Sequence, residues 1–490
     1  MKKLILLLKD HWAGIAFFIF LFSALIFPIQ DGDIFMYLAI ARESLQLGRI
    51  PTVDPFLYTF RDWNIFHEWL SYFFWYGFYI LGGLAGVTLF KATLWLISFF
   101  WIYAQKGFRQ AAEPFTLVIL FLAAKASSHR FVEKSSLFSD LLSVIVLCSL
   151  LQAEPPWKKL RWMFPILFLL GVNLHPGFVV AMAWLGAFLF CRTITERKWP
   201  EKEALQTLFF SIFACFFNPL TWQGLVYPFH TVLKEEWNLY RKMNYEWLPT
   251  FQSPFLETWE VRALIGLITI VTIQLLWQTW KGRENILFHW VVYILLMYFA
   301  ISANRFIATS SLGLSVLAIS LSDNILQFKN DRLKLAANLT LGILFTLGAL
   351  SIGKQGYWTA AGPRTFKFGI DENMMPIYAA QEFKNKNWQG RIFNEFGWGS
   401  YLAWELKASH SLFIHGHIDD PRFLANNYFA IGRSQEEFDQ TMAQHQIQYI
   451  FLDINGIKGP PVHKITTFFR DWEIAYQDAW AIIFKKKGSP

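Results

Sequence analysis

The sequence is poor in charged residues. Lys, Arg, Asp and Glu make up 16% of the 490 residues, against roughly 25% in an ordinary soluble domain. A chain with so little charge and 54% hydrophobic residues is not disordered, and it is a poor candidate for a purely soluble globule. Aromatic residues reach 19%, with 51 Phe and 23 Trp, an excess typical of lipid contact and membrane interfaces. The composition therefore predicts a membrane protein with many spans.

Cysteine is scarce, and long basic runs are absent. Cys148, Cys191 and Cys215 fall in or beside apolar runs, and none lies in the polar C-terminal region. The sequence therefore offers no disulfide framework. The net charge of +8 is spread over short loops between apolar segments. This pattern indicates Lys and Arg held on the cytoplasmic side of a membrane, and it argues against a nucleic-acid partner.

Eleven apolar runs can be recognised along the chain. They lie near residues 12–29, 84–105, 114–126, 137–153, 162–173, 177–192, 204–217, 262–280, 286–301, 306–322 and 335–352. Several are shorter than the roughly 20 residues of a typical spanning helix. The stretch 69–83 is also apolar, and its placement decides the topology. If it is an interfacial helix and the N-terminus is inside, the cytoplasmic segments carry about three times the Lys and Arg density of the opposite segments.

We therefore predict about eleven transmembrane helices, with the N-terminus in the cytoplasm and the C-terminus outside. The first external loop then covers residues 30–83, and the transmembrane domain covers residues 1–353. The first run lacks a small-x-small cleavage site, so we interpret it as a membrane anchor and not as a signal peptide. The predicted location is the cell inner membrane, with a periplasmic C-terminal part.

This topology brings polar residues from separate parts of the chain to the external face. They are Asp31, Asp33, His67, Glu68, Arg130, Asn173, His175, Asn304 and Arg305, with Asp140 just inside the external end of its helix. Ionisable groups at membrane depth are costly and mark functional cavities. Simpler structural roles stay open: a capping turn for the two aspartates, interfacial anchoring for the His–Glu pair, snorkelling for the arginines, a helix–helix hydrogen bond for Asp140 and a chain break at His175.

From about residue 355 the composition changes to charged residues, turns and short alternating strands. Strands are predicted at 391–394, 411–415 and 447–453, and a hairpin at 473–477 and 480–485. A capping box at Ser434 and Glu437 predicts a helix that continues to about His445. Strands that alternate with helices indicate a small α/β domain. We place it at residues 354–490, outside the membrane.

Two local motifs suggest metal chemistry. Asp31 and Asp33 are separated by one residue just past the first span, and such carboxylates chelate a divalent cation or supply a general base. Glu68 is the third carboxylate that we assign to this site. His415 and His417, followed by Asp419 and Asp420, form a weaker candidate for a transition-metal site. A polar surface or a substrate contact is the simpler explanation for these histidines.

The first external loop resembles the GT-C class of integral-membrane glycosyltransferases. This class includes the protein O-mannosyltransferases and the transferases that add aminoarabinose to lipid A. Members have an acidic residue just after the first span, matched here by Asp33. An interfacial helix follows, matched by the segment with Tyr37, Arg42 and Glu43, and a second interfacial helix is matched by residues 69–83. In this family, the acidic residue is expected to act as a base or to hold a metal.

The resemblance extends over roughly residues 1–350, in layout more than in identity. Glu68 falls where members often have an acidic residue, and Asp140 matches an Asp found in many of them. His175 stands where relatives often carry a Lys near the lipid phosphate. Residues 394–401 resemble an element of the oligosaccharyltransferase catalytic subunits, but its Asp is absent here, so its role in acceptor recognition is not carried over.

The resemblance implies a glycosyltransferase that moves a hexose or pentose from a polyprenyl-phosphate-linked donor to a glycan, lipid or protein acceptor on the external face. No phosphate-cradling glycine loop is present, and none is needed for such a donor. The implied site residues fall into three groups. They are Asp33, Asp31 and Glu68 for catalysis, Arg130, His175 and Arg305 for the donor phosphate, and His67 and Asp140 in support.

Three alternatives remain. An oligosaccharide ligase would transfer a whole glycan with a similar site. A transporter or flippase also needs many spans, but such proteins usually have repeated halves and charges near the bilayer midplane. The sequence has no internal repeat, and its polar residues cluster near one face. A membrane scaffold without catalytic activity is the third alternative.

Overall fold

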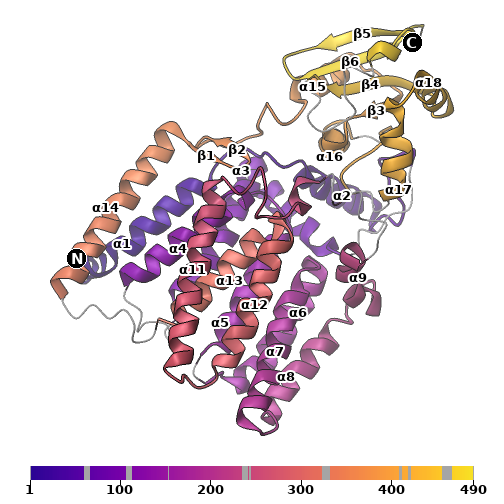
Figure 1. Ribbon diagram of the computed structural model, residues 1–490. Coiled ribbons are helices and arrows are strands. Elements are labelled where there is room, and N and C mark those ends of the chain that lie inside the picture. Colours follow the sequence, from indigo (N-terminus) through magenta and orange to yellow (C-terminus); the bar gives the residue numbers. More distant parts are fainter. Residues whose placement is uncertain are drawn as a thin grey trace.

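The computed structural model describes residues 2–59, 67–105, 113–152, 154–233, 241, 244–322, 331–407, 411–417, 421–454 and 466–488. Helices dominate about the first 355 residues, and a small sheet region follows at the C-terminal end of the chain (Figure 1). This sheet region lies against one end of the helical bundle. The candidate site lies where the two parts meet.

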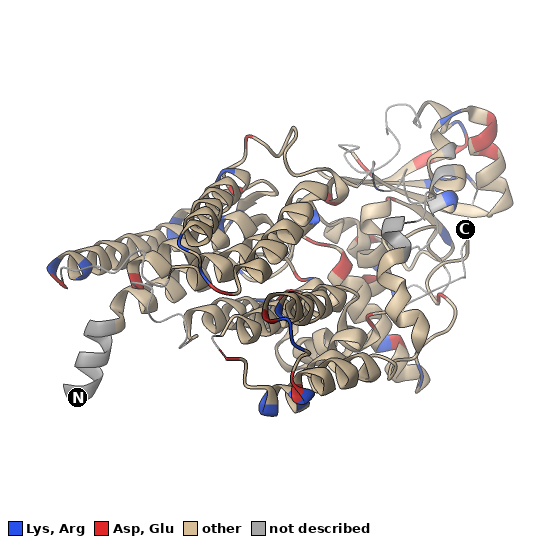
Figure 2. Cartoon of the chain, turned by 60° about the horizontal axis from the view of Figure 1, so that its bottom comes forward, with Lys and Arg blue, Asp and Glu red and all other residues tan. Residues whose placement is uncertain are grey.

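Each predicted apolar run falls on a helix. These helices are α1 (Lys2–Leu25), α3 (Trp69–Tyr103), α4 (Glu113–Ser127), α5 (Ser136–Leu150), α6 (Trp157–Leu174), α7 (Phe178–Glu196), α8 (Lys202–Ala214), α11 (Trp259–Trp280), α12 (Ile286–Ser302), α13 (Ile307–Ser320) and α14 (Asp331–Gln355). Within the described ranges, four of them (α3, α7, α11 and α14) are long and apolar enough to cross a membrane. Charged residues lie mainly at helix ends, in connections and in the C-terminal region (Figure 2). The chain is a multi-pass membrane protein, and the count of eleven spans stays a prediction.

α3 changes direction at a pair of glycines. Gly82 (φ −150°, ψ 18°) and Gly83 (φ 58°, ψ −146°) leave the helical conformation. The second conformation is open essentially to glycine alone. Beyond the bend the chain folds back, and the rings of Phe78 and Phe90 stack with their centroids 3.9 Å apart. The bend separates the segment predicted to lie at the interface from the segment predicted to span.

Short connections gather at the end of the bundle that faces the C-terminal region. They include the 3₁₀ turns η2 (Ser128–Arg130), η4 (Tyr245–Trp247) and η5 (Asn304–Phe306). η4 and η5 contact each other. The backbone N–H of Asn304 donates to the carbonyl oxygen of Leu248 at 2.8 Å. A further helix, α9 (Trp222–Leu233), precedes η4.

The helix α2 (Asp33–Leu47) is buried along most of its length, whereas the sequence predicts an amphipathic helix at the membrane surface. The Arg42 guanidinium lies 4.4 Å over the Trp404 ring and donates to the Trp404 carbonyl oxygen at 3.0 Å. Phe35 meets Tyr401 edge to face, with ring centroids 5.0 Å apart. Trp404 and Tyr401 belong to the helix α16 (Gly399–Glu405) of the C-terminal region. The C-terminal region therefore covers the outer face of α2.

The C-terminal region contains a mixed four-stranded sheet in the order β3–β4–β6–β5. β3 and β4 are parallel, and β6 is antiparallel to both β4 and β5. The elements are β1 (Tyr357–Thr359), β2 (Gly362–Arg364), α15 (Ile377–Asn385), β3 (Arg391–Asn394), α16 (Gly399–Glu405), α17 (Pro421–Phe423), α18 (Gln435–Gln444), β4 (Ile447–Asp453), β5 (Trp472–Gln477) and β6 (Ala481–Lys486). The predicted closing hairpin is confirmed as β5 and β6.

Two local predictions for this region have different outcomes. The Ser434 hydroxyl accepts the backbone N–H of Glu437 at 3.2 Å, which confirms the predicted start of α18. The strand predicted at 411–415 is wrong, since only Leu412 forms isolated bridges, to Leu57 and Ile392. The bridge to Leu57 shows the reason, because this segment pairs with the connection between α2 and α3 as well as with the edge of the sheet.

Replacing Gly83 by alanine should strain the bend in α3, because an L residue in such a conformation costs of order 1–3 kcal/mol. We expect a lower thermal-unfolding midpoint for the detergent-solubilised Gly83→Ala variant. Gly77→Ala is the matched control, since Gly77 lies in the same helix with open space around its Cβ position. Equal midpoints for the two variants would show that the bend does not require glycine.

Candidate functional site

The turn between α1 and α2 carries two carboxylates. The Asp31 Oδ1 atom accepts the backbone N–H of Asp33 at 3.0 Å, so Asp31 shapes the turn. The Asp33 side chain is 35% exposed. The C-terminal region approaches closely here, because a Cβ atom on Gly416 would lie 3.3 Å from Asp33 Oδ1 and one on Gly32 would lie 3.1 Å from the Gly397 carbonyl oxygen. Asp33 therefore lies where the bundle and the C-terminal region meet.

Lys134 is the central cation of the site. Its Nζ atom lies 3.1 Å from Asp31 Oδ2, 3.2 Å from Asp33 Oδ2 and 2.6 Å from Glu246 Oε1. Burial lowers the pKa of the Lys134 amine, but the three carboxylates outweigh burial and raise the pKa above its ordinary value. Burial raises the pKa of Asp31, and Lys134 opposes this effect. Lys134 is thus an ammonium ion shared by three acidic side chains.

Arg130 and Glu246 form the adjoining ion pair. The Nη1 atom of Arg130 lies 2.7 Å from Glu246 Oε1, the same oxygen that Lys134 reaches. Burial would raise the pKa of Glu246, but Arg130 and Lys134 hold it well below its usual value. The Arg305 guanidinium lies 4.3 Å over the ring of Trp247, and its charge also acts on Glu246. Three cations and three carboxylates therefore balance one another.

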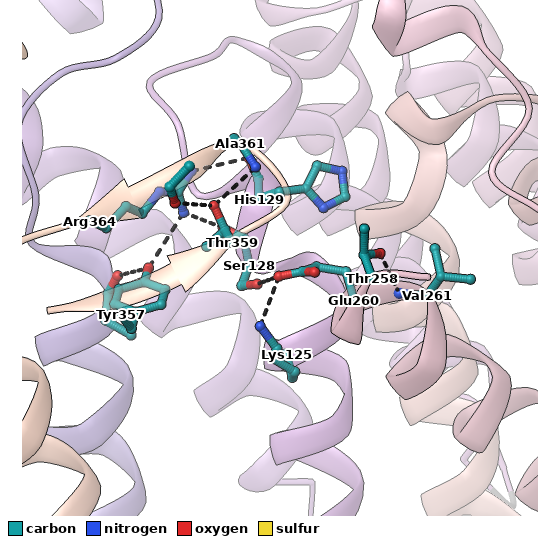
Figure 3. A network of polar contacts seen from close by, with 12 residues as sticks. Lys125, Ser128, His129, Thr258, Glu260, Val261, Tyr357, Thr359, Ala361 and Arg364 are labelled. Carbon is teal, nitrogen blue, oxygen red and sulfur yellow. Dashed lines mark hydrogen bonds and ion pairs between the residues drawn. The ribbon is translucent and has the colours of Figure 1, made fainter. Parts of the chain in front are cut away.

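A network of polar contacts holds the main chain beside Arg130 (Figure 3). The Arg364 side chain, 1% exposed, donates to the carbonyl oxygens of Ser128 and His129. On the other side, the Ser128 hydroxyl donates to Glu260 Oε1 of α11 at 2.9 Å. The turn η2 is therefore fixed both by the hairpin that follows α14 and by α11.

Glu68 lies in a second group with three histidines. Its Oε1 atom is 3.5 Å from His67 Nε2 and 3.9 Å from His417 Nε2, and His175 also acts on its charge. The His67 ring stacks on Tyr227 of α9, with centroids 4.4 Å apart. Burial raises the pKa of Glu68, but the hydrogen bond from His67 and the nearby imidazoles lower it by more. Glu68 is therefore a carboxylate held among imidazole rings.

His175 contributes a hydrogen-bond donor. Its Nδ1 atom accepts the backbone N–H of Gly177 at 3.0 Å and lies 2.9 Å from Ser139 Oγ. The neutral ring then carries its proton on Nε2. Burial lowers the pKa of His175 to about 4. At neutral pH, His175 therefore offers a hydrogen bond from Nε2 and carries no positive charge.

Asp140 lies in α5, where its side chain is buried. The Thr309 hydroxyl donates to Asp140 Oδ1 at 2.6 Å and links α5 to α13. The Asp140 charge also acts on Arg130. The helix–helix hydrogen bond that we considered for this residue is therefore present, together with an electrostatic effect on the site.

The predicted metal ligands have other partners in the structure. Both nitrogens of His415 are engaged, since Nε2 lies 2.6 Å from Asp54 Oδ2 and Nδ1 accepts the N–H of His417. The Lys134 ammonium lies between Asp31 and Asp33, where a shared cation would bind. Among the described residues, no group of three or more His, Cys, Asp or Glu side chains is placed to hold a metal ion. Asp419 and Asp420, the carboxylates next to the candidate histidines, lie outside the described residues.

The structure brings together the site residues predicted from the first 310 positions and adds two that the sequence analysis did not assign. Lys134 lies four residues after Arg130, and Glu246 directly precedes Trp247. The sequence contains one indication of a role for Lys134 and Glu246: each is a charged residue in a connection predicted to lie on the external side of the membrane. That signal does not show which charges pair with which, because the partners come from distant segments.

Removing the Lys134 ammonium should destabilise the fold, because it leaves three partly buried carboxylates with one cation fewer. For Lys134→Met we expect the free energy of unfolding to fall by about 3–5 kcal/mol. The control is Lys384→Met. The Lys384 ammonium pairs with Glu405 and the side chain is 48% exposed, so its loss should lower the free energy of unfolding by at most about 1 kcal/mol. Unfolding midpoints in the same detergent measure the difference, and a stable Lys134→Met protein would contradict the central role of this ion cluster.

The buried imidazoles should make stability depend on pH. Burial lowers the pKa of His417 from 6.5 to about 4. Between these values the unfolded chain binds more protons than the folded chain, so this contribution to stability is complete above about pH 6.5 and is lost as the pH falls towards 4. The unfolding midpoint of the wild type should therefore fall more steeply over this window than that of His417→Gln. Parallel pH profiles would contradict the assignment.

No protein-family model and no curated protein sequence matches the chain, but solved structures do. ArnT from Cupriavidus metallidurans, bound to undecaprenyl phosphate, is 12% identical with a TM-score of 0.59, and the match covers 100% of this chain and 99% of that one. The archaeal oligosaccharyltransferase AglB from Archaeoglobus fulgidus, in complex with an inhibitory peptide and a dolichol-phosphate, is 12% identical with a TM-score of 0.60, over 92% and 70%. The arabinofuranosyltransferase AftD from Mycobacteria is 15% identical with a TM-score of 0.50, over 97% and 41%. The chain therefore has the fold of the GT-C glycosyltransferases.

Proposed function

We propose that the protein is a membrane glycosyltransferase that moves a sugar from a polyprenyl-phosphate-linked donor to an acceptor hydroxyl. The observation that carries this proposal is the cluster of Asp33, Lys134, Arg130 and Arg305 at one end of a GT-C fold. Two similar structures contain a polyprenyl or dolichol phosphate. The cluster offers a carboxylate and several cations side by side, which is the combination that such a transfer needs.

Asp33 is the proposed general base. It is more exposed than Asp31, at 35% against 18%, and Asp31 is already engaged in shaping the turn. As the acceptor oxygen attacks the anomeric carbon, Asp33 takes its proton and the bond from that carbon to the phosphate oxygen breaks. The bonding electrons leave with the phosphate. A base in this role typically contributes about 10²–10⁴-fold to the rate.

The donor phosphate is proposed to bind near Arg130, Arg305 and His175. A guanidinium presents a fork of donors that matches phosphate oxygens, and the Arg305 guanidinium lies over the Trp247 ring. His175 adds a neutral N–H donor. The Asp140 charge acts on Arg130. These residues therefore stabilise the charge that grows on the leaving phosphate.

Glu68 with His67 and His417 is proposed to form the acceptor side of the site. It is the second candidate for the base, but its carboxylate is buried at 6% exposure. Another structure of the Archaeoglobus fulgidus enzyme holds zinc and sulfate. Here Lys134 already lies between the two aspartates, so the proposed reaction contains no metal step.

The proposed arrangement in the cell follows the charge pattern. The helical part at 1–353 would lie in the inner membrane with its N-terminus in the cytoplasm, and the part at 354–490 would lie in the periplasm. The sugar is a hexose or a pentose. Transfer of a whole oligosaccharide is the second candidate function, and the similarity to AglB, an oligosaccharyltransferase, supports it.

Asp33→Asn should nearly abolish transfer, by about 10²–10⁴-fold, because the amide cannot accept the acceptor proton. The measurement is release of undecaprenyl phosphate from undecaprenyl-phosphate-linked sugars by protein in nanodiscs. Asp471→Asn, at an exposed position of the C-terminal region, is the control and should be fully active. Turnover of Asp33→Asn at the wild-type rate would overturn the assignment of the base. Absence of transfer by the wild type itself would overturn the proposed activity and favour a transporter or scaffold.

A further inference from the structure

Glu246 forms ion pairs with two cations of the site, Arg130 and Lys134. A single carboxylate oxygen receives both Arg130, at 2.7 Å, and Lys134, at 2.6 Å. The two cations are 9% and 14% exposed, whereas the Glu246 side chain is 28% exposed. Glu246 is therefore the most exposed of the three side chains, and it already occupies the two donors that an external anion would seek.

A phosphate oxygen would seek the same donors as this carboxylate oxygen. Both are anionic acceptors that form short, charge-assisted hydrogen bonds with guanidinium and ammonium groups. One oxygen of Glu246 takes both the Nη1 atom of Arg130 and the ammonium of Lys134, so a phosphate oxygen can bind these same two donors only in its place. Any phosphate that reaches Arg130 and Lys134 must compete with Glu246.

We propose that Glu246 is a resident anion which the phosphate of the lipid-linked donor displaces from Arg130 and Lys134. This inference rests on the proposed function, because it names the donor phosphate as the displacing group. In the absence of donor, Glu246 keeps the cations paired and the site closed. Displacement opens the site to the phosphate and conserves the balance of charge, since one anion replaces another.

The element that carries Glu246 is suited to such a movement. Glu246 lies in the three-residue turn η4, and the Asn244 side chain accepts the backbone N–H of Glu246 at 3.0 Å. Two further contacts hold η4 to η5: the Trp247 ring under Arg305 and the Leu248 carbonyl oxygen that accepts from Asn304. The carboxylate can therefore leave the cations while its own backbone stays attached to η5 beside Arg305.

The alternative is that Glu246 stays in place and acts as a clamp that orients Arg130. The two roles predict opposite effects of neutralising the side chain. If Glu246 competes with phosphate, its removal strengthens phosphate binding. If Glu246 orients Arg130, its removal weakens binding, because the guanidinium loses its fixed position.

The test is the binding of undecaprenyl phosphate to the full-length protein in nanodiscs, with wild type, Glu246→Gln and Glu257→Gln compared. Glutamine keeps the shape of the side chain and removes its charge. We expect Glu246→Gln to bind undecaprenyl phosphate about tenfold more tightly than the wild type. Glu257, exposed in the same connection before α11, is the matched control and should bind like the wild type. Glu246→Asp, which keeps the charge on a shorter side chain, should be intermediate and covers the case in which the glutamine variant fails to fold.

The outcomes distinguish failure of the proposed displacement of Glu246 from failure of the proposed function. Unchanged or weaker binding by Glu246→Gln, with normal binding by the wild type, overturns the displacement and leaves the proposed function intact. Absence of binding by all three folded proteins overturns the proposed donor and the displacement together. Inorganic phosphate is the second probe. If it binds Glu246→Gln as tightly as undecaprenyl phosphate does, the site takes a free phosphate, and the assignment to a lipid-linked donor is overturned.

Discussion

The site depends on one ammonium group shared by three carboxylates. Lys134 joins Asp31 and Asp33, from the turn after α1, to Glu246, from a connection more than 200 residues later in the chain. Charges with so little exposure are stable only when they are paired. Arg130 and Arg305 complete a balance of three cations and three carboxylates. Because its partners come from separate connections, this balance fixes the relative positions of the helix ends around the site.

The C-terminal region completes the site. Arg42 and Phe35 of α2 bind α16, which brings Gly397 and Gly416 close to the Asp31–Asp33 turn. The same approach places His417 3.9 Å from Glu68. The helical part of the chain supplies the proposed base and the cations, and the C-terminal region supplies His417 and the close approach of Gly416 to Asp33.

The sequence predicts those features that depend on local pattern. Apolar runs identify the helices, because the apolar character of a buried or lipid-facing helix is visible in its own residues and does not depend on a distant partner. The predicted topology places Asp33, Glu68, Arg130 and Arg305 on one face of the membrane. The structure brings together the segments that carry them. What the sequence could not predict depends on distant pairs. His415 looks like a metal ligand until Asp54, 361 residues away, is found bound to it, and α2 looks amphipathic until α16 covers it.

The charge balance also explains how such a site tolerates the proposed reaction. When Asp33 takes a proton, the cluster loses one negative charge. At the same moment the donor phosphate, until then esterified on both sides, becomes a monoester and gains one. The negative charge thus moves from the aspartate to the leaving group across a field set by Lys134, Arg130 and Arg305, and the total stays constant. A preorganised set of cations favours such a transfer because it needs little rearrangement during the reaction. A lysine between two aspartates can therefore provide fixed positive charge where a metal ion would otherwise be required.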